Sequence, residues 1–162
     1  RKHKTRDYVI ELAHGADSRR LIGGQIMDLE AEGKSLTKAQ LVRVHEAKTA
    51  ALLTSSLRLG AMVADASPAK LDALTDFGRN LGLAFQVIDD ILDVTQPTEK
   101  LGKTAGKDAA AEKATYPAIM GLATSVKEAQ RLTTRALNAL KPFGRKAHRL
   151  DQIAHYLLDR DY

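Results

Sequence analysis

Hydrophobic positions along the chain recur at the spacing of helices, and strand patterns are nearly absent. No alternating run of β-branched or aromatic residues extends beyond a few positions. The pattern predicts a first helix over about 6–14, a break near Gly15, and a second helical stretch over about 17–32. We therefore expect an all-α protein.

Two capping signals mark the next helices. The capping box Thr37-Lys-Ala-Gln40 opens a long helix that we expect to reach about Val63, with a kink near Lys48. Ser67-Pro68 combines an N-cap residue with proline at the first helical position. It predicts a further helix that runs to about Val94.

The C-terminal part begins with a long segment rich in glycine and lysine, over 95–115. A loop of this length in a compact domain is usually functional or disordered. The pattern Ser125-Val-Lys-Glu128 resembles a second capping box and predicts the start of an amphipathic helix. Pro142 and Gly144 are expected to end that helix, and a last helix should reach about Asp159.

Three carboxylates stand out in the stretch 80–94, which is apolar almost all round and therefore predicts a buried helix. Asp89 and Asp93 are four residues apart and share one helical face, Gln86 extends that face, and Asp90 lies about 100° round. Aspartate is seldom buried unless it is paired or binds a metal. Carboxylates near a helix C-terminus also face the negative end of the helix dipole. Clustered oxygen ligands suit Mg²⁺, which in turn binds phosphate.

Composition narrows the class of protein. The chain has 162 residues, of which 44% are hydrophobic and 4% aromatic, and it has no cysteine. A disulfide scaffold and a thiolate metal site are thereby excluded, and we expect a cytoplasmic protein. No run of eighteen apolar residues is present, so we expect no integral membrane association. The net charge of +5 is scattered and rarely alternates with aromatic residues, so we expect no nucleic acid as a partner.

The segment Phe85-Gln-Val-Ile-Asp-Asp-Ile-Leu-Asp93 resembles the second aspartate-rich motif of the trans-prenyl diphosphate synthases, which include the farnesyl and geranylgeranyl diphosphate synthases. Three further segments resemble the same family. Gly23-Gly-Gln-Ile-Met-Asp-Leu29 matches its Gly-Gln-x-x-Asp-Leu segment, and Lys48-Thr49 matches its Lys-Thr pair at a helix break. The loop Leu101–Asp108, followed by Lys113 before Thr-Tyr-Pro, is similar to the loop after the second motif.

The resemblance implies a role for each matching residue. Mg²⁺ is the implied cofactor, and its implied ligands are four carboxylates: Asp89, Asp90, Asp93 and Asp28. The implied substrate-binding residues are Gln25, Lys48, Lys103 and Lys113, and the implied catalytic residues are Lys48, Thr49 and Gln86. The lysines contact the diphosphate, whereas Thr49 and Gln86 face the developing carbocation. We interpret His45 as structural, because a lone histidine on a helix is seldom a ligand.

The resemblance covers nearly the whole chain but only the C-terminal half of the family. Residues 1–162 contain no first aspartate-rich motif and no Gly-Gly-Lys-Arg segment. We expect one all-α unit that forms the C-terminal half of the isoprenoid synthase helical bundle and is a fragment of a larger domain. The implied reaction joins an allylic prenyl diphosphate to isopentenyl diphosphate, in a protein that is a homodimer when intact, and this chain alone should be inactive or nearly so. The alternatives are a non-catalytic subunit of a heteromeric prenyl synthase and, ranked lower, a basic helical protein that binds nucleic acid.

Overall fold

The structure is a computed structural model that describes residues 2–95 and 114–158. Every regular element in these two ranges is a helix, as the hydrophobic pattern predicts. In chain order the elements are α1 (Thr5–Ala16), α2 (Leu21–Glu30), α3 (Lys38–His45), the π-helical turn η1 (Glu46–Ala50), α4 (Ala51–Val63), α5 (Pro68–Thr95), α8 (Tyr116–Met120), α9 (Leu122–Ala139), the 3-10 segment η2 (Lys141–Ala147) and α10 (His148–Leu158).

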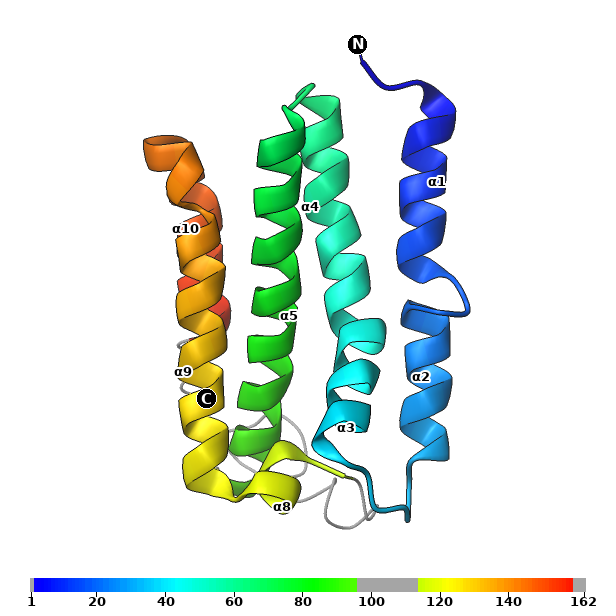
Figure 1. Ribbon diagram of the computed structural model, residues 1–162, viewed down its shortest axis with the longest axis vertical. Helices are drawn as coiled ribbons and strands as arrows, with labels where there is room; N and C mark the ends of the chain where they lie inside the picture. The colour runs from blue at the N-terminus through cyan, green and yellow to red at the C-terminus, as the bar shows by residue number, and fades with distance from the viewer. Residues whose placement is uncertain (1, 96–113, 159–162) are drawn as a thin grey trace.

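The longer helices lie side by side along the long axis of the molecule, and the short α8 crosses its lower end (Figure 1). α1 and α2 follow one another along one side, and α3, η1 and α4 form the next column. α5 packs against α4 and η1 on one side and against α9 on the other. α5 is therefore the central helix, and its buried face contributes Phe77, Leu81, Ala84 and Val87 to the core.

The break that the sequence predicts near Gly15 lies at 17–20, between α1 and α2, and the second helix begins at Leu21 and not at Asp17. Gly15 is buried inside α1, where a Cβ atom would lie 2.5 Å from Oγ of Ser55 on α4. The glycine therefore allows α1 to approach α4 closely, and it does not end the helix. The turn that follows is built on Asp17, whose side chain accepts a hydrogen bond from the backbone N–H of Arg19 at 2.8 Å.

The predicted starts of α3 and α5 are confirmed. Thr37 Oγ1 accepts a hydrogen bond from the Gln40 N–H, and Gln40 Oε1 accepts one from the Thr37 N–H at 2.8 Å. α5 begins at Pro68 and reaches Thr95. The kink expected near Lys48 is the π-helical turn η1, which joins α3 to α4 without a break in the helix.

The predicted start of the C-terminal amphipathic helix is wrong by three residues. α9 begins at Leu122, directly after Gly121, whose φ is 77°. The short helix α8 precedes it, and the sequence pattern did not predict α8. Ser125 is buried within the first turn, and its hydroxyl donates to the Gly121 carbonyl at 3.0 Å. Glu128 accepts hydrogen bonds from Arg131 instead of capping the helix. α9 ends before η2, which contains Pro142 and Gly144 as expected.

The outer face of α1 and α2 is apolar, although it is exposed. Six large hydrophobic side chains on these two helices are between 50% and 61% exposed: Val9, Ile10, Leu12, Ile22, Ile26 and Leu29. Apolar surface of this extent is characteristic of interaction sites. Among the helices that the structure describes, none combines the length and the apolar character needed to cross a membrane.

Candidate functional site

The turn η1, which carries Lys48 and Thr49, is held between α2 and α5 by glycine contacts. A Cβ atom on Gly24 of α2 would lie 2.2 Å from the backbone nitrogen of Lys48. A Cβ atom on Gly82 of α5 would lie 2.5 Å from Cα of Ala50. Only glycine permits this close approach of two backbones. Both neighbouring helices therefore touch the backbone of η1, which fixes the Lys48–Thr49 pair between them.

The Gly-Gln-x-x-Asp segment joins α2 to η1 through an ion pair. Asp28 Oδ2 accepts a hydrogen bond from Lys48 Nζ at 2.7 Å, and both side chains are partly buried. Gln25 lies one turn earlier on α2 and is exposed. Gly23 packs against the turn before α2, because a Cβ atom on Gly23 would meet the Ser18 carbonyl oxygen. Two of the predicted site residues, Asp28 and Lys48, are thus in direct contact.

The aspartates lie in the last two turns of α5, and their environments differ. Asp89 is half-buried, whereas Asp93 is only 3% exposed, and Gln86 is half-buried on the same helix. Asp90 is buried, and its Oδ2 accepts a hydrogen bond from the backbone N–H of Tyr116 at 2.9 Å. Asp90 therefore faces the start of α8, and its place among the magnesium ligands stays a prediction.

The pKa of His45 responds to charged residues on three elements, α2, η1 and α5. Burial lowers the pKa of His45 to about 4; the carboxylates of Asp28 and Asp89 act in the opposite direction, and the ammonium of Lys48 lowers the pKa further. Electrostatic effects of this kind require nearby charges. Charges on α2, η1 and α5 thus all act on His45, which links three segments that are distant in sequence.

His45 itself was assigned only a structural role by sequence reasoning. The signal that could have revealed it is its position three residues before Lys48, which places both side chains near one helical face. Thr49 and Gln86 lie on η1 and α5, two elements that pack together. Lys103 and Lys113 fall outside the described residues, so their predicted contacts with diphosphate stay predictions.

The carboxylates suit a magnesium ion that is shared with a phosphate. In the two ranges that the structure describes, no three side chains of histidine, aspartate or glutamate lie close enough to hold a metal ion by themselves. Mg²⁺ is commonly bound through only one or two carboxylates, together with substrate phosphates and water. Asp89 and Asp93, one turn apart on one face of α5, satisfy that smaller requirement.

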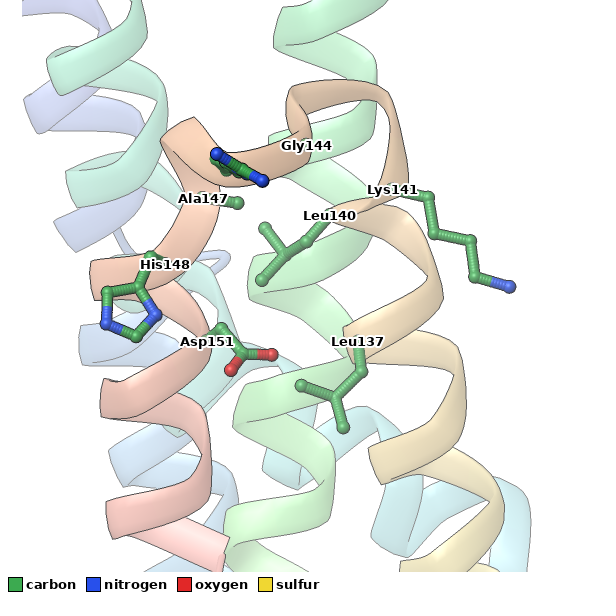
Figure 2. A pocket seen from close by; sticks show the side chains of 8 residues that line it. Leu137, Leu140, Lys141, Gly144, Ala147, His148 and Asp151 are labelled. Atoms are coloured by element: carbon green, nitrogen blue, oxygen red, sulfur yellow. The ribbon is translucent and has the colours of Figure 1, made fainter.

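One cavity of the described chain lies at the C-terminal end of α9, away from these residues. It has a volume of about 650 Å³ and is formed by the end of α9, η2 and the start of α10 (Figure 2). Leu137 and Leu140 line it together with Asp151, whereas the Lys141 side chain points away from it (Figure 2). No residue predicted for the site lines this cavity, so the candidate site is defined by the contacts between α2, η1 and α5.

Known proteins are similar to this chain in both sequence and fold. Residues 2–156 match the family described as Polyprenyl synthetase. A geranylgeranyl diphosphate synthase from Cyanophora paradoxa is 40% identical over 154 residues, which cover 94% of this chain and 51% of that protein. Large subunit 1 of a chloroplastic heterodimeric geranylgeranyl pyrophosphate synthase from Arabidopsis thaliana is 44% identical over 154 residues, covering 93% of this chain and 42% of that subunit.

A solved structure agrees with these relatives. The geranyltransferase from Helicobacter pylori, complexed with magnesium and isoprenyl diphosphate, matches with a TM-score of 0.75 at 32% identity, over 98% of this chain and 53% of that chain. The chain spans about half the length of the curated relatives that it matches. The sequence relatives and the solved structure thus agree on the family. The chain therefore belongs to the polyprenyl synthetase family.

Proposed function

We propose that the complete protein is a trans-prenyl diphosphate synthase, which joins an allylic prenyl diphosphate to isopentenyl diphosphate in a magnesium-dependent reaction. The observation that carries the proposal is the Asp28–Lys48 ion pair between α2 and η1, in a chain of the polyprenyl synthetase family. The charges of this pair and of Asp89 on α5 all act on the buried His45. Residues 1–162 supply one side of the reaction site.

The diphosphate of the allylic substrate is the ligand for the Lys48 ammonium. Lys48 forms an ion pair with Asp28 at 2.7 Å, and its ammonium has three N–H donors that can turn to phosphate oxygens. Asp89 and Asp93 would hold Mg²⁺, which when bound supplies positive charge to the leaving diphosphate. Asp28 and Asp90 are further candidates for this role, and Lys103 and Lys113 are further candidates for binding the diphosphate.

The chemistry is an ionisation followed by a condensation. The C–O bond of the allylic diphosphate breaks, and its electron pair leaves with the diphosphate. The double bond of isopentenyl diphosphate then supplies the electrons of the new C–C bond, and a proton is lost. Thr49 and Gln86 carry side-chain oxygens with partial negative charge, which would stabilise the allylic cation.

The charge on a leaving diphosphate is stabilised best when ligands surround it. Residues 1–162 carry a single aspartate cluster of the Asp-Asp-x-x-Asp form. We therefore expect this chain by itself to have little or no activity. In the complete protein, a second group of ligands would come from residues outside the chain.

The test is an incorporation assay on the complete protein. It is incubated with farnesyl diphosphate, radiolabelled isopentenyl diphosphate and Mg²⁺, and the extracted prenyl product is counted. We expect labelled product with Mg²⁺ and none after EDTA, and Asp89→Asn should lower turnover by at least about a hundredfold, as removal of a charge-stabilising group commonly does. Turnover that is unaffected by EDTA and by Asp89→Asn would contradict the proposal.

Assembly is part of the same proposal. We propose that the complete protein is a homodimer, and the six exposed apolar side chains on α1 and α2 support an interface on that face. The alternative is a subunit of a heteromeric synthase, which is favoured by the heterodimeric enzyme among its relatives. Light scattering on the complete protein and on its Ile26→Lys variant distinguishes them: a homodimer gives twice the protomer mass, and the variant should dissociate. A monomer that gains activity only with a second subunit supports the alternative.

A further inference from the structure

His45 is buried at the last position of α3, directly before the turn that carries Lys48 and Thr49. The residue is 5% exposed. Its ring lies against the Tyr116 ring of α8, with the centroids 5.6 Å apart and the planes tilted by 32°. Its Nε2 lies 4.0 Å from Oδ2 of Asp90 on α5. One imidazole therefore touches both the aspartate helix and the helix that follows it.

Asp90 and Tyr116, the two residues next to His45, are also joined to each other. The backbone N–H of Tyr116 donates to the same oxygen of Asp90 at 2.9 Å. Tyr116 is 1% exposed, and its burial, together with the carboxylates of Glu128 and Asp90, raises the pKa of its phenol to about 12. The phenol is therefore neutral at ordinary pH. We call these three residues the His45–Asp90–Tyr116 cluster.

The histidine is a poor choice for packing alone. Its Nδ1 is buried and has no hydrogen-bond partner among the described residues. Polar atoms in protein interiors are normally hydrogen-bonded, and an apolar side chain of similar size avoids that penalty. The cluster also lies where position is critical, because His45 precedes Lys48 by one turn and Asp90 is the neighbour of Asp89.

We propose that His45 is a positioning residue for the diphosphate and magnesium site. It connects the start of η1 to Asp90, and so it fixes Lys48 and Thr49 relative to the Asp89 carboxylate. Asp90 takes part by holding the start of α8 through the Tyr116 N–H. This inference rests on the function proposed above, since it concerns the same ligands.

The test uses inorganic diphosphate with Mg²⁺ as the probe and the complete protein. The apparent dissociation constant for Mg²⁺ is measured at a fixed concentration of diphosphate, and a melting curve without ligand reports stability. His45→Phe keeps the ring against Tyr116 but removes both nitrogens, whereas His45→Gln keeps an N–H donor. The matched control is Ser55→Ala, since Ser55 is fully buried and its Oγ also has no partner in the described part of the chain.

We expect His45→Phe to weaken Mg²⁺ binding by about tenfold, as loss of a group that orients metal ligands commonly does. His45→Gln should retain part of the affinity, and Ser55→Ala should retain all of it, whatever each does to the ligand-free melting temperature. Asp90→Ala should weaken binding more than Asp90→Asn, because asparagine keeps an oxygen for the Tyr116 N–H.

Two results would overturn the inference. If His45→Phe changes only the ligand-free melting temperature and binds Mg²⁺ as the wild type does, His45 is a core residue; if His45→Phe does not fold, the same result for His45→Gln is decisive. If the wild type itself fails to bind Mg²⁺ with diphosphate, the proposed function fails, and the inference fails with it. The first result leaves the proposed function intact, so the two failures are distinguishable.

Discussion

At the scale of single residues, two glycines determine how closely the parts of the site approach. The Lys48–Thr49 turn lies against α2 and α5 because Gly24 and Gly82 have no side chains. The glycines of the Gly-Gly-Gln-x-x-Asp pattern predict the close approach of a backbone or a ligand, and the structure identifies the partner of Gly24 as the backbone of Lys48. A sequence does not show which backbone a glycine touches.

Gly24→Ala should destabilise the protein and weaken the site together. The new Cβ would lie 2.2 Å from the Lys48 nitrogen, and a backbone atom cannot turn away. We expect a loss of about 1–3 kcal/mol in the free energy of unfolding, which is typical of overpacking. Gly60→Ala is the control, because nothing lies within 4 Å of the Cβ position on α4. Urea denaturation should show that variant to be more stable by about 0.5–1 kcal/mol.

The buried histidine gives the folded chain a pH dependence. Burial lowers the pKa of His45 from 6.5 to about 4, so the unfolded chain binds the proton more tightly. The contribution of neutral His45 to the free energy of unfolding is therefore fully present above about pH 6.5, and it is lost as the pH falls toward 4. Between pH 7 and pH 5, the wild type should lose about 2 kcal/mol more in the free energy of unfolding than His45→Phe. Urea denaturation without metal measures both, and equal losses would show that His45 is not buried in the neutral form.

At the scale of elements, helix boundaries that depend on local signals could be predicted from the sequence. Features that depend on tertiary contacts could not. Thr37 and Pro68 mark helix starts by bonds and sterics within a few residues, so the sequence shows them. Ser125 was also predicted to cap a helix, but the helix begins earlier, after Gly121. The Ser125 hydroxyl donates a hydrogen bond to the Gly121 carbonyl instead. The break near Gly15 was predicted, but the contact of Gly15 with Ser55 of α4 was not.

The candidate site follows the same rule. The residue types and their helical spacing predicted Asp89 and Asp93 on one face of a buried helix, and the structure has them there. The Asp28–Lys48 ion pair and the contact of Asp90 with Tyr116 depend on which helices pack together. Such contacts join residues 20 and 26 positions apart, and spacing along the chain does not encode them.

Arg58 joins three helices, and its loss should loosen the outermost one. Its Nε donates to Glu11 of α1 at 2.8 Å, and its Nη1 donates to Thr75 of α5 at 2.8 Å. Arg58→Met keeps the apolar stem but removes these bonds, which are worth about 1 kcal/mol for a partly exposed pair. Hydrogen exchange over Thr5–Ala16 should become about fivefold faster, whereas exchange in α5 should not change.

Arg131→Met provides the comparison for that experiment. In the described part of the chain, the hydrogen bonds of the Arg131 guanidinium go to Glu128 on its own helix, at 2.8 Å. Its removal should leave exchange in α1 unchanged. Faster exchange in α1 in both variants, or in neither, would show that Arg58 does not anchor that helix.

At the scale of the whole molecule, the chain is a layer of helices with two different sides. The core between α5 and α9 is well packed, and the outer face of α1 and α2 remains apolar and exposed. The candidate site lies where η1 packs between α2 and α5. This arrangement suits one side of an enclosed site in a larger protein.

The most direct measurement is a calorimetric titration of inorganic diphosphate into the complete protein, with and without Mg²⁺, for the wild type and Asp89→Asn. Asp72→Asn is the control, because Asp72 is an exposed aspartate on the same helix. We expect binding to the wild type and to Asp72→Asn only when Mg²⁺ is present, and binding at least about tenfold weaker in Asp89→Asn. Diphosphate that binds equally well without Mg²⁺, or equally well to Asp89→Asn, would contradict the assignment of the aspartate helix as the magnesium and diphosphate site.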